Sequence, residues 1–153
     1  MKQEDKELLL RFLSMTLPYG IQVKAEGDNE PYTLLSIYPN NGIVLIGINM
    51  GGVYATSKVK IDTVKPYLRP MSSMTEEEDK ERIQLGIWRS SQNNGYEVTR
   101  INPEGIYESY DSQAFQKALV FLLKNHFDVF GLIPKGLAIA VTEENNPYNI
   151  TEK

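Results

Sequence analysis

The sequence has no cysteine, only one histidine (His126) and only one tryptophan (Trp88). Without cysteine there are no disulfides, no thiolate metal ligands and no thiol nucleophile. A single histidine also excludes a metal site built from two histidines of one chain. The longest apolar runs, such as 43–48 and 119–123, are far shorter than the about 20 residues of a membrane-spanning helix. We therefore expect a protein of a reducing cytoplasm, with no membrane association and no cofactor.

What is present is typical of a folded domain. The chain has 153 residues, of which 41% are hydrophobic and 24% are charged, which are ordinary values for globular proteins. This length predicts one domain over residues 1–153, and the polar segment from about residue 143 is expected to fray. The net charge of −4 disfavours tight non-specific binding to nucleic acid.

Hydrophobic periodicity and turn residues predict an α+β fold, with a mostly antiparallel sheet of about five strands packed by two or three helices. Asn41-Gly42 predicts a hairpin turn, because both residues tolerate positive φ. Residues 62–74 are expected to be irregular because Pro66 and Pro70 interrupt them. The expected helices cover 4–15, 76–85 and 112–125, and the expected strands cover 21–25, 32–38, 43–48, 58–61, 96–101 and 106–109.

A capping box opens the second predicted helix. The Thr75 hydroxyl can accept from the amide of Glu78, and the Glu78 carboxylate can accept from the amide of Thr75. The acidic run 76–79 that follows is therefore interpreted as a solvated helix start. A catalytic or metal-binding role for it has no support from spacing. The sparse apolar face of this helix, with Ile83, Leu85 and Ile87, predicts a surface helix.

Two segments invite a catalytic hypothesis that their spacing does not support. His126 could join Asp128 and a serine, Ser72 or Ser73, in a nucleophilic triad, but no nucleophile-elbow pattern is present. We interpret His126 as a structural residue at a helix C-terminus, where the dipole favours a cation. The glycine-rich run 47–52 follows a strand but lacks the lysine and Ser/Thr of a phosphate loop, so a tight turn is the better interpretation.

A local basic and aromatic stretch is the candidate interaction surface. Lysine and arginine could follow a nucleic-acid backbone while tyrosines stack on bases, but tyrosine and lysine on an exposed sheet have the same composition without a ligand. Trp88 beside Arg89 adds residue types that dominate binding hot spots. The candidate residues are Tyr54, Lys58, Lys60, Lys65, Tyr67, Arg69, Trp88 and Arg89.

Two further segments, 65–78 and 125–138, look like fold-defining connections. The first is bounded by Pro66 and Pro70, and the second turns at Gly131 and returns Leu132, Ile133, Leu137 and Ala138 toward the core. Residues 62–85 and 112–140 resemble stretches of short uncharacterised proteins from phages, prophages and mobile elements of gut Bacteroidales bacteria. The resemblance implies a phage accessory protein made in a bacterial cytoplasm. It implies no catalytic residue, because the family has no assigned activity.

The sequence alone therefore predicts a non-enzymatic protein-binding or adaptor protein. Single-stranded nucleic-acid binding through residues 54–69 is one alternative, and a metal-dependent hydrolase using scattered carboxylates is another. A self-assembling phage structural protein is a third. A binding protein should expose a patch rich in Tyr, Trp or Met, whereas a hydrolase should gather carboxylates of perturbed pKa in a pocket.

Overall fold

The computed structural model describes residues 1–84, 87–89, 96–98 and 112–148, with side chains described for 1–81, 117 and 119–148. Short 3₁₀ turns occur at Leu17–Tyr19, Ile61–Thr63 and Met71–Ser73. The helices are α1 (Gln3–Thr16), α2 (Glu76–Gln84) and α3 (Ser112–Lys124), and the strands are β1 (Gln22–Ala25), β2 (Pro31–Tyr38), β3 (Ile43–Asn49), β4 (Tyr54–Lys60), β5 (Val64–Leu68), β6 (Ile87–Arg89), β7 (Tyr96–Val98) and β8 (Ile139–Ala140).

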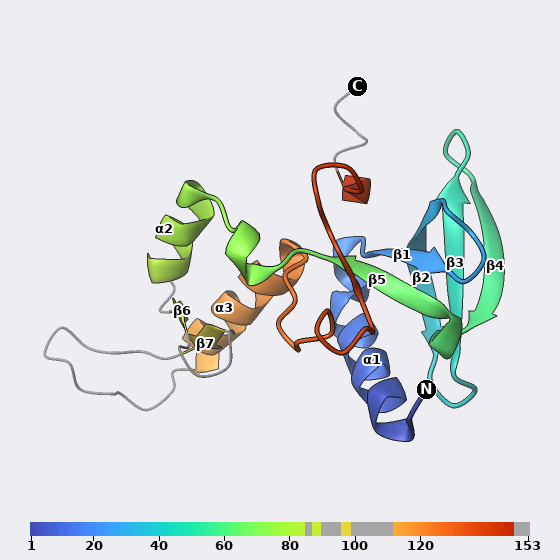
Figure 1. Ribbon diagram of the computed structural model, residues 1–153, viewed down its shortest axis with the longest axis horizontal. Helices are drawn as coiled ribbons and strands as arrows, with labels where there is room; N and C mark the ends of the chain where they lie inside the picture. Colours follow the sequence, from blue (N-terminus) through green and yellow to red (C-terminus); the bar gives the residue numbers. More distant parts are fainter. Residues whose placement is uncertain (85–86, 90–95, 99–111, 149–153) are drawn as a thin grey trace, which may run out of the picture.

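A six-stranded sheet in the order β4-β3-β2-β1-β5-β8 dominates the fold. Strands β1 to β5 pair antiparallel (Figure 1). Within this sheet only the two-residue β8 runs parallel to its neighbour, β5. The α+β prediction with a mostly antiparallel sheet is therefore confirmed, with six strands in this sheet. Within the described ranges, no helix is long and apolar enough to cross a membrane.

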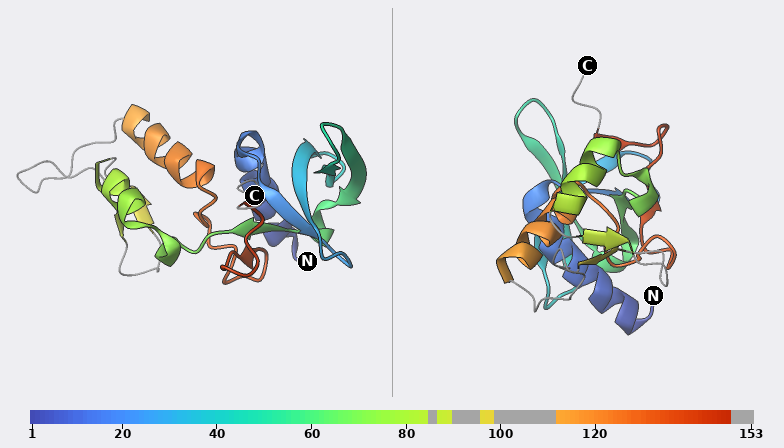
Figure 2. Two further views of the ribbon diagram at one scale, coloured as in Figure 1. Left: turned by 90° about the horizontal axis from the view of Figure 1, so that it is seen from above. Right: turned by 90° about the vertical axis from the view of Figure 1, so that its left-hand side faces the viewer.

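Helix α1 covers one face of this sheet. Its buried residues include Leu9, Phe12 and Leu13, whose spacing places them on one side of the helix. They pack against buried strand residues that include Val23 and Ile46. Burial of each such side chain stabilises the fold by about 1.5–3 kcal/mol. The opposite face of the sheet is called the outer face below, and none of the described helices lies over its β4 end (Figures 1 and 2).

Helices α2 and α3 lie at the other end of the molecule, beyond β5 (Figure 2). A second apolar cluster of Phe121, Leu122 and Phe127 packs there against Met71 and other partly buried residues. The two ends are connected by β5, whose last residues run directly into this region. The β4 edge of the sheet and the α2–α3 region therefore lie at opposite ends of the molecule (Figure 1).

The prediction that residues 62–74 are irregular is wrong for Val64–Leu68, which form β5, a strand with four of its five residues buried. Pro66 is tolerated there because it stands opposite Val23 in a non-hydrogen-bonded pair. The Glu26 amide donates to the Thr63 carbonyl (2.8 Å), so Glu26 and Thr63 form a hydrogen-bonded pair. Hydrogen-bonded and non-hydrogen-bonded pairs alternate along the ladder, which makes Val23 and Pro66 a non-hydrogen-bonded pair. The missing N–H of Pro66 therefore leaves no gap in the ladder with β1.

One turn prediction and one helix boundary need correction in detail. The hairpin at Asn41-Gly42 exists, but only Gly42 has a positive φ, of 61°, and the loop between β2 and β3 covers residues 39–42. The second helix ends at Gln84, and Ile87, expected on that helix, begins β6. Strand β7 pairs with β6. The strand expected at 106–109 lies outside the described residues.

Arg69 and Glu78 link the end of β5 to α2. The guanidinium donates to both carboxylate oxygens of Glu78, at 2.8 Å and 2.7 Å, and lies over the Phe127 ring at 4.3 Å. The predicted capping box is confirmed, because Thr75 and Glu78 exchange both hydrogen bonds. Burial alone would raise the pKa of Glu78, but its hydrogen bonds with Arg69 and Thr75 outweigh burial and lower it.

Candidate functional site

Strand β4 is an open edge of the six-stranded sheet. It spans seven residues, and all of them except Val59 are exposed. The strand at the opposite edge, β8, has only two residues. Edge strands present unpaired N–H and C=O groups with which another chain can pair, and proteins commonly keep such edges short or covered. Here β8 is a short edge, whereas β4 is a long edge (Figure 1) whose residues are mostly exposed.

The register between β3 and β4 fixes which backbone groups point outward. The amide of Met50 donates to the carbonyl of Val53 at 2.7 Å, and the amide of Ile61 donates to the carbonyl of Gly42 at 2.8 Å. Hydrogen-bonded and non-hydrogen-bonded pairs alternate along an antiparallel ladder. The residues whose N–H and C=O groups point away from β3 are therefore Tyr54, Thr56, Lys58 and Lys60.

Most of these outward backbone groups are free. The carbonyl of Lys60 accepts from the Thr63 hydroxyl at 2.7 Å. Across the described ranges, the N–H and C=O groups of Tyr54, Thr56 and Lys58 have no hydrogen-bond partner. Three consecutive outward-facing residues thus offer both a donor and an acceptor to an added strand.

The same residues place their side chains together on the outer face of the sheet. Alternate residues of a strand point to opposite faces, and Val44 and Ile46 of β3 are buried on the α1 side. Their neighbours on β4, Val59 and Ser57, share that side. Tyr54, Thr56, Lys58 and Lys60 therefore point away from α1, so one row of residues provides both the free backbone groups and the outer-face side chains.

The rings of Tyr54 and Tyr38 contact other residues on this part of the outer face. The Tyr54 ring covers Gly47, where an added Cβ would lie 3.2 Å from the ring and 2.7 Å from Leu35. Tyr54 still has 41% of its surface exposed. The Lys58 ammonium lies 5.2 Å from the centre of the Tyr38 ring, within range of a cation–π contact.

The β3–β4 hairpin ends in an exposed apolar tip. Met50 and Val53 are 68% and 72% exposed, and the glycines between them, Gly51 and Gly52, both have positive φ. Such a pair of residues is typical of the tight turns that suit the twist of a hairpin. The glycine-rich run is therefore a turn, as predicted, and it leads into a strand, whereas a phosphate loop would lead into a helix.

The structure separates the other residues of the predicted surface from this row. Lys65 lies on β5 and lines a groove described below, whereas Tyr67 is buried, with 7% exposure. Arg69 is engaged with Glu78, so Tyr67 and Arg69 do not contribute to an exposed basic surface. The side chains of Trp88 and Arg89, on β6, lie outside the described ones.

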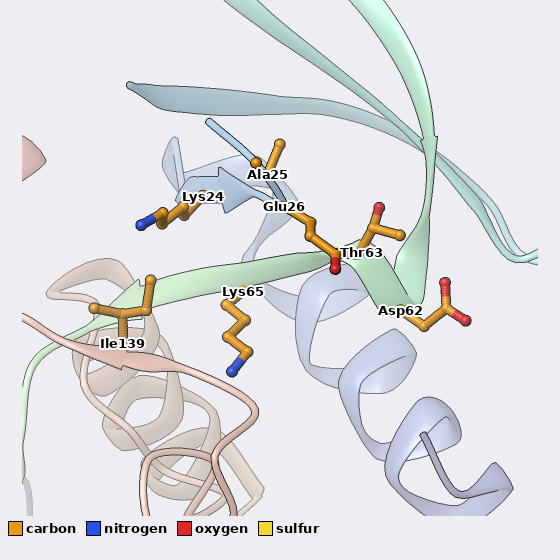
Figure 3. A pocket seen from close by; sticks show the side chains of 8 residues that line it. Lys24, Ala25, Glu26, Asp62, Thr63, Lys65 and Ile139 are labelled. Carbon is orange, nitrogen blue, oxygen red and sulfur yellow. The ribbon is translucent and has the colours of Figure 1, made fainter. Parts of the chain in front are cut away.

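A groove of about 460 Å³ lies beside the β1–β5 pair (Figure 3). Lys24 and Lys65, which are opposite each other in the ladder, occupy one side of it. Glu26 extends toward Thr63 and Asp62 on the other side. The charges are thus mixed, and the Thr63 hydroxyl donates to the carbonyl of Lys60 at 2.7 Å. Within the described part of the chain, no three His, Asp or Glu side chains gather to hold a metal ion.

His126 has a structural environment rather than a catalytic one. Its φ of 63° and the bonds from its amide to Leu123 and from the Phe127 amide to Leu122 form a Schellman cap at the end of α3. Asp128 does not pair with it, since both carboxylate oxygens accept amides, from Leu132 at 2.8 Å and Ile133 at 2.9 Å. The pairing of His126 with Asp128 that the triad hypothesis requires is therefore not present.

The expectation that the dipole favours a cationic His126 is wrong. Burial and the nearby Arg69 charge lower the pKa of the imidazole to about 4. The ring stacks on Tyr148, with centroids 3.8 Å apart. Its Nδ1 atom is buried and lacks a hydrogen-bond partner in the described part of the chain. Loss of hydration thus outweighs the dipole, and the neutral ring acts as packing surface for Tyr148.

Tyr148 is a residue whose role the sequence did not reveal. Its hydroxyl accepts from the Gln22 amide at 3.1 Å and donates to the Tyr67 carbonyl at 2.7 Å. Gln22 and Tyr67 are the next hydrogen-bonded pair expected along the β1–β5 ladder. The Tyr148 hydroxyl therefore bridges the two strands where a direct backbone hydrogen bond is expected. The C-terminal segment is thereby held on the sheet as far as Tyr148, within the part that was expected to fray.

Comparison with known proteins gives no relative. No protein-family model, no curated protein and no solved structure matches this chain. A function must therefore be argued from the geometry of the described residues alone.

Proposed function

We propose that this protein is a binding module that accepts an extended segment of a protein partner as an additional strand on β4. The observation that supports this most is the run of free backbone groups at Tyr54, Thr56 and Lys58 on an exposed seven-residue edge. In strand addition, backbone hydrogen bonds provide affinity and alternate side chains provide specificity. Both elements lie on the same row of residues here.

The surroundings of β4 suit a docked segment. The exposed apolar residues Met50 and Val53, with the half-exposed Tyr54 ring, lie at one end of the edge. Exposed apolar side chains beside a polar rim are typical of interaction sites. A partner strand would cover them while it satisfies the backbone of β4. The resemblance noted in the sequence suggests a bacterial host protein as the partner.

Two variants of Thr56 test strand addition directly. The Thr56 amide points away from β3, so Thr56→Pro removes an outward donor without breaking the β3–β4 ladder. Thr56→Ala removes the side chain but keeps the donor. Displayed random peptides of about ten residues, long enough for one strand, would be selected on the natural protein. Their affinities for the two variants would then be measured.

We expect the selected peptides to bind Thr56→Ala normally and to bind Thr56→Pro at least about tenfold more weakly, since a donor is lost and the ring obstructs pairing. Circular dichroism would confirm that both variants are folded. Equal binding of the peptides to both variants would contradict the proposal.

Single-stranded nucleic acid is the rival ligand, because Tyr38 and Tyr54 share the outer face with Lys58 and Lys60. A nucleic-acid ligand should depend on Tyr38 and Tyr54, since stacking contributes about 1–3 kcal/mol per base, and should weaken steeply with salt. Anisotropy of labelled oligothymidine would detect it. Oligonucleotide binding that is lost in Tyr54→Ala but retained in Thr56→Pro would replace strand addition by nucleic-acid binding.

A further inference from the structure

The side chains of β4 that are charged at neutral pH are all positive. They are Lys58 and Lys60, both exposed and both on the outer face. Among the described residues neither lysine forms an ion pair with a carboxylate, whereas Arg69 pairs with Glu78. The protein as a whole has a net charge of −4. The β4 edge is thus a locally cationic strip on an acidic protein.

The register decides where a partner's side chains would lie. Residues of an added strand that pair with the free backbone groups stand directly opposite Tyr54, Thr56 and Lys58 and point to the same outer face. These partner residues are spaced two apart along their strand. Opposite charges at such positions stabilise the pair, and like charges destabilise it. Lysines on an edge therefore reject cationic strands and select acidic ones.

The two ends of the edge differ in chemistry. Lys58 and Lys60 lie at one end, whereas Tyr54, half exposed over Gly47, lies at the other beside Val53 and Met50. An apolar or aromatic side chain opposite Tyr54 would extend this apolar surface, and aromatic pairs across strands are favourable. A partner strand should therefore be acidic at one end and apolar at the other.

The direction of the partner follows from the sheet. All strand pairs from β4 to β5 are antiparallel, and antiparallel pairing is the more stable per residue. We infer that β4 binds an acidic protein segment as an antiparallel seventh strand, with carboxylates opposite Lys60 and Lys58 and an apolar side chain opposite Tyr54. This inference rests on the strand-accepting function proposed above. Read from its N-terminus, the segment has acid, any, acid, any, small or β-branched, any, apolar.

A second copy of the chain fits this edge less well. Two β4 strands that pair antiparallel would bring four lysines and no carboxylate to the new interface. The positive charges would repel one another. An acidic segment of a different protein instead neutralises both lysines of β4, so a heterologous partner is the occupant that the charges favour.

Three synthetic peptides would test the charge pattern and the direction. The first is acetyl-Glu-Val-Glu-Val-Thr-Val-Tyr-amide, the second has lysine in place of both glutamates, and the third is the first sequence in reverse order. Each would carry a fluorophore on a flexible linker. Anisotropy would give its dissociation constant for the natural protein, Thr56→Pro and the double variant Lys58→Glu, Lys60→Glu.

We expect the acidic peptide to bind the natural protein at least about tenfold more tightly than the lysine peptide does. The charge-reversed double variant should invert this preference, since both of its substitutions lie on exposed positions. The reversed peptide should bind more weakly than the acidic one. Thr56→Pro should weaken every peptide that binds.

The outcomes distinguish failure of the acidic, antiparallel partner from failure of strand addition itself. Binding that is sensitive to Thr56→Pro but equal for the acidic and lysine peptides would overturn the acidic partner and leave strand addition standing. Tighter binding of the reversed peptide would overturn the antiparallel direction. Binding that Thr56→Pro leaves unchanged would overturn strand addition itself, and the inference with it.

Discussion

Removal of one oxygen atom, in Tyr148→Phe, should destabilise the whole fold. The Tyr148 hydroxyl bridges the Gln22 amide and the Tyr67 carbonyl at 3.1 Å and 2.7 Å. Phenylalanine keeps the ring that stacks on His126 but leaves one donor and one acceptor between β1 and β5 unpaired. An unsatisfied buried group costs about 1–3 kcal/mol. Because Gln22 is only half-buried, the two groups together should cost about 2–4 kcal/mol.

Urea denaturation followed by circular dichroism would measure this loss. A change of that size should lower the melting temperature of a chain of this length by about 5–15 °C. Tyr38→Phe is the matched control, since Tyr38 lies exposed on the outer face, and it should change the free energy of unfolding by less than about 0.5 kcal/mol. If Tyr148→Phe proves as stable as that control, the Tyr148 hydroxyl does not bridge β1 and β5.

Three further changes probe the remaining contacts. The His126 pKa is about 6.5 in the unfolded chain and about 4 in the fold. Between these pH values the imidazole is protonated in the unfolded chain but neutral in the fold. The contribution of His126 to the free energy of unfolding should therefore be fully present above pH 6.5 and should fall by about 2–3 kcal/mol as the pH drops to 4. His126→Asn, which tolerates the positive φ, should remove that part of the pH dependence in urea titrations. Glu78→Gln should lower the free energy of unfolding by about 1–3 kcal/mol, because Arg69 loses a two-bond partner; an unchanged urea midpoint would refute this. Gly47→Ala should cost about 1 kcal/mol and shift the NMR signals of Tyr54, whose ring lies 3.2 Å from the added carbon; unshifted signals would mean that the ring does not cover Gly47.

The elements predicted well from the sequence are those whose signals are local. The capping box between Thr75 and Glu78 depends on residues three apart and is present. Helix α1 and strands β2 and β3 follow from apolar periodicity and lie within one or two residues of their predicted bounds. Such features need no knowledge of distant partners.

The errors have physical causes that a local pattern does not contain. Strand β5 was missed because Pro66 normally interrupts a central strand, whereas here it occupies a non-hydrogen-bonded position. Tyr148 bonds to the Gln22 amide 126 residues away, and no pattern near Tyr148 predicts that contact. His126 was expected to be charged because the dipole is visible in the sequence, whereas the burial that opposes it is not.

The sequence does not show which residues of the predicted surface are exposed. The basic and aromatic composition of residues 54–69 includes β4, but strand alternation and long-range pairing decide which side chains are available. Lys58 and Lys60 are exposed, whereas Tyr67 is buried and Arg69 binds Glu78. The open backbone edge depends on strand order, which the composition does not reveal.

Amide hydrogen exchange on β4, followed by NMR with and without the acidic peptide, tests the central claim most directly. In the free protein the amides of Ala55, Ser57 and Val59 should exchange slowly, because they bond to β3, and those of Thr56 and Lys58 should exchange fast. Saturating peptide should slow exchange at Thr56 and Lys58. If these two amides are already protected in the free protein, or stay fast when the peptide is bound, β4 does not accept a strand.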